Sequence, residues 1–281
     1  MKKYTQEEFD ALPRNDHGVK HCPAGDYSAI KEFGSNCEFD KQSRFGPDSR
    51  FGKGCVFEQG SEFGNACTFD VGCVFYEECK FEKHCCFGAE CRFQHSCSFG
   101  EGCHFGAHCI FGCGCSYGDF CRFDKNCCFG HSCEFGVYCD FNSACRFAKS
   151  CRFCDSCSFG PDCSFDSYSR FGTFCQFGVN CYFGKNCLFG VGCVFGHNCI
   201  CEFGEFDRML VVSGFDPLNR TTLNFFNVVG DGIYVRSESF AGALHKWLAK
   251  NFKMNKSSYL AGAYSALAMA AQIMLTGDGE K

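Results

Sequence analysis

Residues 67–88 read CTFDVG CVFYEE CKFEKH CCFG, so a cysteine, one variable residue and a phenylalanine recur every six residues. The aromatic position continues from Phe33 to Phe195 without a slip, and Tyr117 is the one substitution among 28 positions. Two residues before almost every aromatic stands a cysteine or a serine. A short period held over this length predicts a solenoid.

Within each repeat the small residue and the aromatic are two positions apart. Side chains two apart point to the same side of a strand, so we expect cysteines and aromatic rings to fill the interior. Three hexads form one 18-residue coil, which predicts about nine coils from 28 hexads. The residue after the aromatic is most often Gly, Asp or Asn, and we expect it to adopt the left-handed backbone at each corner.

In frame, the repeat is F-G-x-x-C-x, which resembles the hexapeptide repeat of left-handed parallel β-helices. Phenylalanine stands in the aliphatic position and cysteine in the small position, over roughly residues 31–204. The resemblance implies a mainly β fold, a triangular solenoid with a left-handed turn. A right-handed helix with a five-residue repeat is the nearest rival, and it would lose this register within a few repeats.

Charges that lie three hexads apart should stack on one outer face and test this register. Six such pairs have opposite charges and three have like charges. Neighbouring strands favour opposite charges, so the count supports a coil of three hexads. The opposite pairs are Glu32/Arg50, Arg44/Glu62, Glu62/Lys80, Lys83/Glu101, Arg122/Asp140 and Glu134/Arg152.

Enzymes occur among the proteins that the repeat resembles. Acyltransferases of the hexapeptide family use a histidine between subunits, and γ-class carbonic anhydrases bind zinc through three histidines. Both usually extrude loops from their coils, whereas every hexad from Phe33 to Phe195 has six residues. The histidines of the repeat are scattered (His84, His95, His104, His108, His131, His197). We therefore expect no catalytic residue, and a divergent acyltransferase is the enzymatic alternative.

The chain has 30 cysteines, of which 24 lie in the small position of the repeat. A buried, reduced cysteine acts as a small apolar side chain, and no signal peptide or apolar run of membrane-spanning length is evident. We therefore expect a cytoplasmic protein with few disulfides. Cys151, Cys154 and Cys157 spell C-x-x-C-x-x-C, but the first and third belong to different walls, so we expect packing and no metal or cofactor. The remaining alternative for the outward cysteines is a redox role (Cys86, Cys113, Cys128, Cys154).

The ends of the repeat predict three domains: an N-terminal cap at 1–29, the β-helix at 30–204 and an α+β domain at 205–281. Thr5 and Glu8 form a capping-box pattern that starts a short helix ending before Pro13. The C-terminal region predicts strands at 209–213, 221–229 and 232–236, with a hairpin turn at 230–232. Helices are expected at 241–252 and 257–275, the second apolar around much of its circumference.

The last two coils expose apolar side chains in outward positions, and residues 171–200 contain one Lys and no Asp or Glu. Such a surface marks an interface, either with the C-terminal domain of the same chain or with another subunit. We therefore expect a protein partner or a homo-oligomer. The candidate interface residues are Phe174, Val179, Tyr182, Leu188, Val191, Val194, Ile200, Tyr264, Leu267 and Ala271.

Arg152 and Arg170 form the one stacked pair of basic residues on a face. Two stacked guanidinium groups repel unless an anion joins them, so they are a candidate site for a phosphate-bearing ligand such as a nucleotide. The alternative is a solvated ladder of charges that Glu134 partly neutralises. The net charge of −5 shows no basic footprint for duplex nucleic acid.

The whole chain also resembles uncharacterised proteins of phage and gut-bacterial genomes that carry long C-x-F-G runs. Those proteins share a short N-terminal segment and a C-terminal module like residues 220–226 and 231–236 here. The resemblance implies a phage or mobile-element origin and no mechanism. The leading hypothesis is a non-catalytic binding or scaffold protein with a C-terminal domain that docks or oligomerises. The alternative is a phage counter-defence protein that sequesters a nucleotide signal or blocks a host effector.

Overall fold

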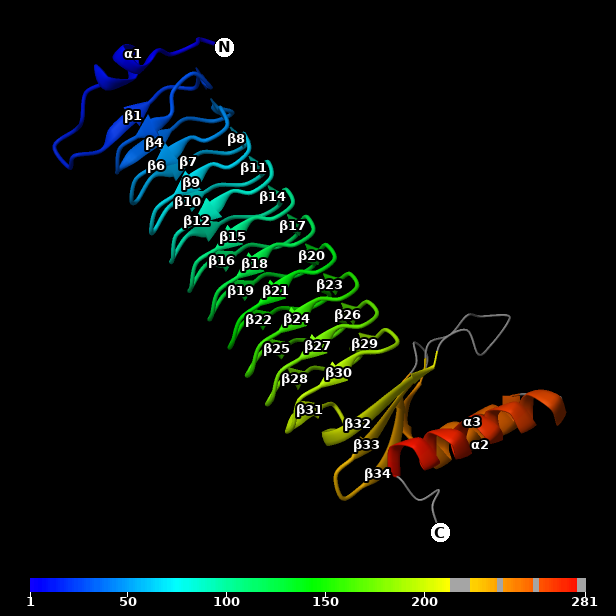
Figure 1. Ribbon diagram of the computed structural model, residues 1–281. Coiled ribbons are helices and arrows are strands. Elements are labelled where there is room, and N and C mark those ends of the chain that lie inside the picture. The colour runs from blue at the N-terminus through cyan, green and yellow to red at the C-terminus, as the bar shows by residue number, and fades with distance from the viewer. Residues whose placement is uncertain (213–222, 237–239, 255–257, 277–281) are drawn as a thin grey trace.

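The structure, a computed structural model, describes residues 1–212, 223–236, 240–254 and 258–276 of the chain. It is a straight rod of parallel β-coils with a small N-terminal cap at one end and a module of strands and helices at the other (Figure 1). Strands three hexads apart pair in parallel, as with Phe105 against Phe123, so each turn consists of three hexads. The rod has about ten turns, one more than the hexad count predicts, because parallel pairing already begins at Lys20.

Three walls of short parallel strands make up the rod. The first wall contains β1 (Lys20–Cys22), β4 (Cys37–Phe39), β7 (Val56–Phe57), β10 (Val74–Phe75), β13 (Arg92–Phe93), β16 (Ile110–Phe111), β19 (Cys128–Phe129), β22 (Arg146–Phe147), β25 (Ser164–Phe165), β28 (Tyr182–Phe183) and β31 (Cys199–Cys201). The second contains β2 (Asp26–Tyr27), β5 (Arg44–Phe45), β8 (Glu62–Phe63), β11 (Lys80–Phe81), β14 (Ser98–Phe99), β17 (Ser116–Tyr117), β20 (Glu134–Phe135), β23 (Arg152–Phe153), β26 (Arg170–Phe171) and β29 (Leu188–Phe189). The third contains β3 (Glu32–Phe33), β6 (Arg50–Phe51), β9 (Thr68–Phe69), β12 (Cys86–Phe87), β15 (His104–Phe105), β18 (Arg122–Phe123), β21 (Asp140–Phe141), β24 (Ser158–Phe159), β27 (Gln176–Phe177) and β30 (Val194–Phe195).

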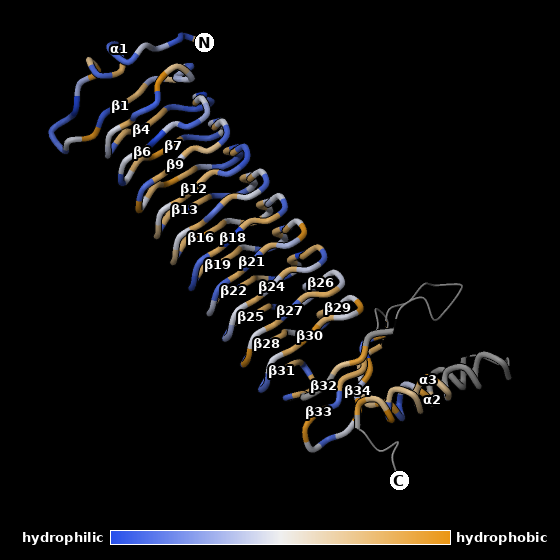
Figure 2. The backbone as a smooth tube through the Cα atoms, in the orientation of Figure 1, coloured by the Kyte–Doolittle hydropathy of each residue, from blue (hydrophilic) through white to orange (hydrophobic). Residues whose placement is uncertain are grey.

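The interior is a solid stack of aromatic rings, as the repeat predicts. The Phe105 ring stacks on Phe87 and Phe123 with centroids 4.8 and 4.7 Å away and planes nearly parallel. It meets Phe99 and Phe111 edge to face at 5.0 and 5.1 Å. Each wall thus contributes one column of rings, and burial of each phenylalanine contributes on the order of 1.5–3 kcal/mol before chain entropy is subtracted. Figure 2 shows apolar residues recurring in every coil along the rod.

The cysteines of the repeat are buried beside the rings, except for the partly buried Cys193, and all 30 cysteines are free thiols. Their sulfurs lie near backbone carbonyls of the preceding coil: the Cys103 thiol donates to the Glu82 carbonyl at 3.5 Å, and the Cys121 thiol to the Gly100 carbonyl at 3.4 Å. Where serine stands in place of cysteine it also donates to a carbonyl, as Ser169 does to Asp166 at 3.0 Å. Both residue types therefore act as small buried donors.

The corners correct one sequence expectation. The residue with positive φ is not the one that follows the aromatic; it directly precedes the inward cysteine or serine, as in Asn126 (62°) and Ala144 (58°). The glycine after the aromatic instead permits close approach of successive coils. A Cβ on Gly100 would lie 2.8 Å from the carbonyl carbon of Glu82 in the coil before it. Because such a contact forces the backbones apart, glycine is favoured there for space.

The ladder of charges behaves as the register of three hexads predicts. Five of the six opposite pairs form ion pairs, from 2.9 Å for Lys83 with Glu101 to 3.5 Å for Arg50 with Glu32 and for Lys80 with Glu62. In the sixth, Arg122 and Asp140 are strand neighbours, and Asp140 accepts a hydrogen bond from Ser158. These exposed pairs fix register more than they add stability, because solvent screens them.

The N-terminal cap closes one end of the aromatic core. Helix α1 (Gln6–Asp10) begins with the expected capping box between Thr5 and Glu8, and both of its hydrogen bonds are present. Phe9 of this helix is buried and meets the Phe33 ring edge to face at 5.0 Å. Tyr4 stacks on Tyr27 at 4.7 Å. The first rings of the columns are thereby covered.

The C-terminal module continues the first wall instead of forming a separate sheet. After β31 the chain turns back, and four antiparallel strands follow: β32 (Gly204–Val212), β33 (Leu223–Val228), β34 (Gly232–Arg236) and β35 (Ala241–Ala243). The expected hairpin turn joins β33 to β34. Helices α2 (Leu244–Met254) and α3 (Ser258–Thr276) complete the module. The ends of the expected segments at 213, 221–222 and 257 lie outside the described residues.

The two faces of this added sheet have different neighbours. Phe206 and Phe226 on one face cover the last rings of the rod, with Phe206 5.2 Å from Phe195. Phe225 on the other face packs against Trp247 of α2 and the buried residues of α3. The strands are therefore a lid on the aromatic core and a platform for the two helices.

A set of polar contacts, here called the joint, connects the added strands to the rod through Asn224 and Arg236. The buried side-chain amide of Asn224 accepts from the Phe189 N–H and donates to the Phe189 carbonyl, both at 3.1 Å. It thus pairs with the last strand of the second wall as a further strand would. Arg236 forms a buried ion pair with Glu202 beside it. Open strand edges need such cover, and here side chains provide it.

Candidate functional site

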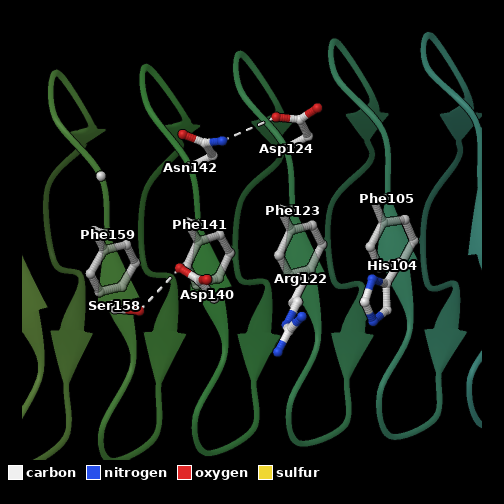
Figure 3. Close-up of a pocket in the computed structure, with 11 residues that line it drawn as sticks. His104, Phe105, Arg122, Phe123, Asp124, Asp140, Phe141, Asn142, Ser158 and Phe159 are labelled. Carbon is white, nitrogen blue, oxygen red and sulfur yellow. Dashed lines mark hydrogen bonds between the residues drawn. The ribbon is translucent and has the colours of Figure 1, made fainter.

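The rings and thiols fill the interior of the rod, so the candidate sites are grooves and patches on its outside. A shallow groove of about 560 Å³ crosses the third wall (Figure 3). His104, Arg122, Asp140 and Ser158 project into it from successive strands, and Asp124 and Asn142 come from the corner. Ser158 donates to Asp140 at 3.1 Å and Asn142 to Asp124 at 3.2 Å. Four of these side chains are therefore paired with a neighbour from the adjacent coil.

A second groove, on the second wall, contains the predicted pair Arg152 and Arg170. The two residues are strand neighbours, as expected from their spacing. Arg152 also forms an ion pair with Glu134 at 3.4 Å, so part of its charge is neutralised. The groove holds about 340 Å³, and Ser132, Ser150 and Tyr168 complete its lining. Tyr168 was not predicted from the sequence to line this groove. The available signal was its position, because a bulky residue stands three positions after the inward Phe165.

The apolar residues of the last coils lie on several walls and do not form one patch. Phe174 and Val191 share a corner, where the Phe174 N–H donates to the Val191 carbonyl at 2.9 Å. Tyr182 and Ile200 are strand neighbours on the first wall. The C-terminal module leaves the following six exposed by 38–62%, whereas Leu188 is partly buried: Phe174, Val179, Tyr182, Val191, Val194 and Ile200.

The predicted interface residues of the last helix have a different placement. Ala271 is fully buried in the cluster between α3 and the added strands, and Leu267 packs against that cluster. The side chain of Tyr264 lies outside the described residues. Among the α3 side chains that the structure describes, the large apolar ones left exposed are Met269, Ile273 and Met274, exposed by 66%, 47% and 65%.

The sequence predicts an apolar α3 and an interface on it, but the candidate residues named there do not include this outer face. The helix has no charged residue over its 19 positions. One side meets the strands through Ala268, Ala271 and Leu275, and the other side has no cover from the described chain. The signal was present in the sequence as apolar residues that exceed the width of a single packed stripe.

Two histidines of the repeat have structural roles at the corners. Nδ1 of His95 accepts the backbone N–H of Cys113 at 3.0 Å, and Nδ1 of His131 accepts that of Lys149 at 3.2 Å. Asp119 and Asp155 bond to the following coil in the same way. These side chains link successive coils.

The outward cysteines do not share one wall, since Cys86 lies on the third wall and Cys128 on the first. In the C-x-x-C-x-x-C segment, Cys151 and Cys157 are buried and donate to the carbonyls of Gly130 and Gly136, while Cys154 is exposed. Burial raises the pKa of both the Cys86 and the Cys154 thiols. Among the described residues, no three His, Cys, Asp or Glu side chains converge as metal ligands.

This chain matches no protein-family model, no curated protein and no solved structure at a significant level. In the described part of the chain, no helix is long and apolar enough to cross a membrane. Candidate surfaces for function include the outer face of α3, which is exposed, and the groove at the predicted residues Arg152 and Arg170.

Proposed function

We propose that the protein is a non-catalytic scaffold, a stiff rod that self-associates through the outer face of α3. The observation that carries the proposal is the exposure of Met269, Ile273 and Met274 on a helix without charge. Large exposed apolar side chains gathered on one element are typical of interaction surfaces. The rod supports a scaffold role, because every coil is fixed by strand pairing and ring stacking and leaves no lumen.

A second copy of the chain fits this face better than a charged partner. Ala266, Met269, Ala270 and Ile273 recur at the i, i+3, i+4 and i+7 spacing of a helix-packing stripe. In a two-fold pairing of α3 with itself, each methionine would lie against alanines of the other helix, which lets helix axes approach to about 8–10 Å. With no charge on the helix, a charged partner gains no complementary contact there.

Light scattering on the full-length protein tests the proposal. We expect a dimer or higher oligomer that becomes monomeric in Met269→Glu/Ile273→Glu, because the charges would be buried unpaired in the interface. Phe174→Asn/Val194→Thr, which alters exposed apolar residues on the rod, is the matched control and should keep the oligomer. Truncation after Gly204 is a poorer test, because it would remove the Phe206 lid from the Phe195 ring.

Three results would refute the proposal. One is a monomer at all concentrations, and another is an oligomer that survives the α3 substitutions. The third is a protein that is monomeric in solution but binds neutral lipid vesicles through α3, which would identify a bilayer as the occupant of this face.

A further inference from the structure

A column of aromatic side chains lies on the outside of the rod, at the corner between the second and third walls. Phe120 and Tyr138 stack there, with ring centroids 5.3 Å apart and planes within 6° of parallel. Phe174 occupies the same corner position two coils beyond Tyr138. The three side chains are exposed by 49%, 56% and 62%, so solvent reaches this outer column, unlike the columns of the core.

The outer column lacks one ring. Ser156 stands at the corner position between Tyr138 and Phe174. Phe120 covers one face of Tyr138, so the other face is turned toward the coil of Ser156. A Cβ on Gly192 would lie 2.5 Å from the ring of Phe174, so that ring extends over the following coil, away from Ser156. Since stacked strands lie about 4.8 Å apart, the two rings are separated by roughly 10 Å.

The corner residues around this gap are acidic. Over the four coils of the column they include Asp119 and Asp155 and no Lys or Arg. The corner residues are 118–120, 136–138, 154–156 and 172–174. Oδ1 of Asp155 accepts the N–H of Thr173 at 2.7 Å, so this carboxylate lies between the coil of Ser156 and the next one. Burial raises the pKa of the Cys154 thiol, and the negative charges of Asp155 and Asp119 raise it further.

The strands on either side of the corner hold charges of both signs. Arg152 pairs with Glu134 at 3.4 Å on the second wall, and Arg122 neighbours Asp140 on the third. Arg170 is the remaining basic residue on these strands. Corner and flanking strands together contain four acidic and three basic residues, and the acidic excess lies at the corner itself.

We propose that the gap between Tyr138 and Phe174 binds a quaternary ammonium ion, with Asp155 as its counter-ion. A cation is attracted to an aromatic face within about 6 Å of the ring centroid. At the level of Ser156 it would lie about 5 Å from each ring, so both rings contribute. The methyl groups of a quaternary ammonium fill the gap, whereas a primary ammonium is more strongly hydrated.

This group occurs in free choline and in the phosphocholine headgroup of lipids. Like charges oppose each other, so Asp119 and Asp155 disfavour a ligand that carries a phosphate beside its ammonium. The free cation is therefore the ligand that this corner fits.

Calorimetric titration of the full-length protein with choline and with dimethylbutanol, its neutral carbon analogue, tests the site. The two molecules have the same shape, but a carbon replaces the nitrogen in the alcohol. We expect saturable binding of choline and binding of the alcohol that is weaker by roughly tenfold or more, because the attraction to rings and carboxylate requires the charge. Phosphocholine should also bind more weakly than choline, because its phosphate faces Asp155.

Three variants locate the site. Ser156→Phe adds the missing ring, so it should abolish choline binding while the rod stays folded, as the stack of Phe120 on Tyr138 allows. Tyr138→Asn/Phe174→Asn, which keeps residues tolerant of positive φ, should weaken choline by roughly tenfold or more. Asp155→Asn keeps the acceptor oxygen and removes the charge, and it should weaken choline by roughly threefold or more.

Tyr168→Asn is the matched control. It removes a tyrosine of similar exposure, 57%, from another corner, where Ser150 and Asn186 stand at the same position in the coils on either side. The affinity for choline should not change in this variant, and an equal loss would overturn the site.

Four other results would overturn the proposal. Equal affinity for choline and dimethylbutanol would mean that the corner binds apolar groups without regard to charge. Choline binding that survives Ser156→Phe would place the ligand elsewhere, and failure of choline to bind at millimolar concentration would leave the gap without its ligand. Phosphocholine binding as tightly as choline would identify the lipid headgroup in place of the free cation. The oligomeric state plays no part in these readouts, so this site and the α3 interface fail separately.

Discussion

In the solenoid, the Phe105 ring meets neighbours at the distances and angles that recur for rings all along the rod. In the C-terminal module, Asn224 instead makes one specific pair of bonds to a strand 35 residues earlier in the chain. The stability of the rod is therefore spread over equal coils, each dependent on its neighbours. The stability of the joint depends on a few residues with no equivalent elsewhere in the described chain.

Alkaline pH should separate the two regions most strongly. Cysteines pack the rod, whereas none follows Cys201. Burial raises the pKa of the Cys187 thiol to about 12, while an unfolded cysteine titrates near about 8.5. The folded chain keeps a proton that the unfolded chain loses in this window, so the free energy of unfolding falls as pH rises from about 8.5 to about 12. Each such thiol contributes a slope of up to about 1.4 kcal/mol per pH unit.

Urea unfolding between pH 7 and pH 10.5, followed by circular dichroism, measures this effect. Because many thiols act together, we expect the rod to unfold well below pH 12. Fluorescence of Trp247, the one tryptophan, reports on the module separately. A urea midpoint that does not change up to pH 10.5 would show that the thiols are not buried as protonated groups.

The next largest effect is expected from Phe105→Ala in the middle of the rod. It removes a ring stacked on both sides and should cost about 3–5 kcal/mol. Since each coil is stabilised by its neighbours, hydrogen exchange should accelerate in the coils on both sides of residue 105. Phe225→Ala in the module, an equally buried ring, should accelerate exchange near α2 and leave the middle of the rod unchanged. Uniform acceleration throughout the chain in both variants would mean that the two regions unfold as one unit.

Asn224→Leu tests the joint itself. The substitution leaves the N–H and the carbonyl of Phe189 without the amide that pairs with them, and each buried unpaired group costs about 1–3 kcal/mol. We expect a loss of about 2–4 kcal/mol and faster exchange of the Phe189 amide, while the Phe105 amide keeps its protection. A variant as stable as the parent would show that water replaces the asparagine at this edge.

The sequence predicts the rod well because every hexad repeats the same inward packing of an aromatic ring and a small residue. The inward rings and thiols, the register of three hexads, five ion pairs between coils and the capping box at Thr5 all follow from spacing. The joint is different, because no period relates Asn224 to Phe189 or Arg236 to Glu202. Such pairs depend on how the first wall continues into the added strands, which hydrophobic patterns do not specify.

The surface sites likewise include residues that the repeat identifies and residues that it does not. Arg152 and Arg170 are found by counting three hexads along the chain, whereas Tyr168 requires knowing which corner residue points outward. The exposed face of α3 depends on the side that the strands cover, so composition alone does not identify its residues. The sequence-based prediction of positive φ at the residue after the aromatic is also wrong, because composition again does not show which role a residue has. Glycine, Asp and Asn are favoured both where φ is positive and where coils approach closely, and their frequency does not separate the two.

The smallest predicted effect tests that correction at the corners. Ala144 has φ of 58°, and the left-handed backbone costs a non-glycine residue roughly 1–2 kcal/mol. Ala144→Gly relieves this strain but adds freedom to the unfolded chain, so we expect a net gain of about 0.5–1 kcal/mol. Ala107→Gly, two residues after Phe105 and not at a left-handed position, should lose about 0.5–1 kcal/mol because only the second term applies. Thermal unfolding of the two variants gives both signs, and a gain in Ala107→Gly with a loss in Ala144→Gly would reverse the assignment of the corner residues.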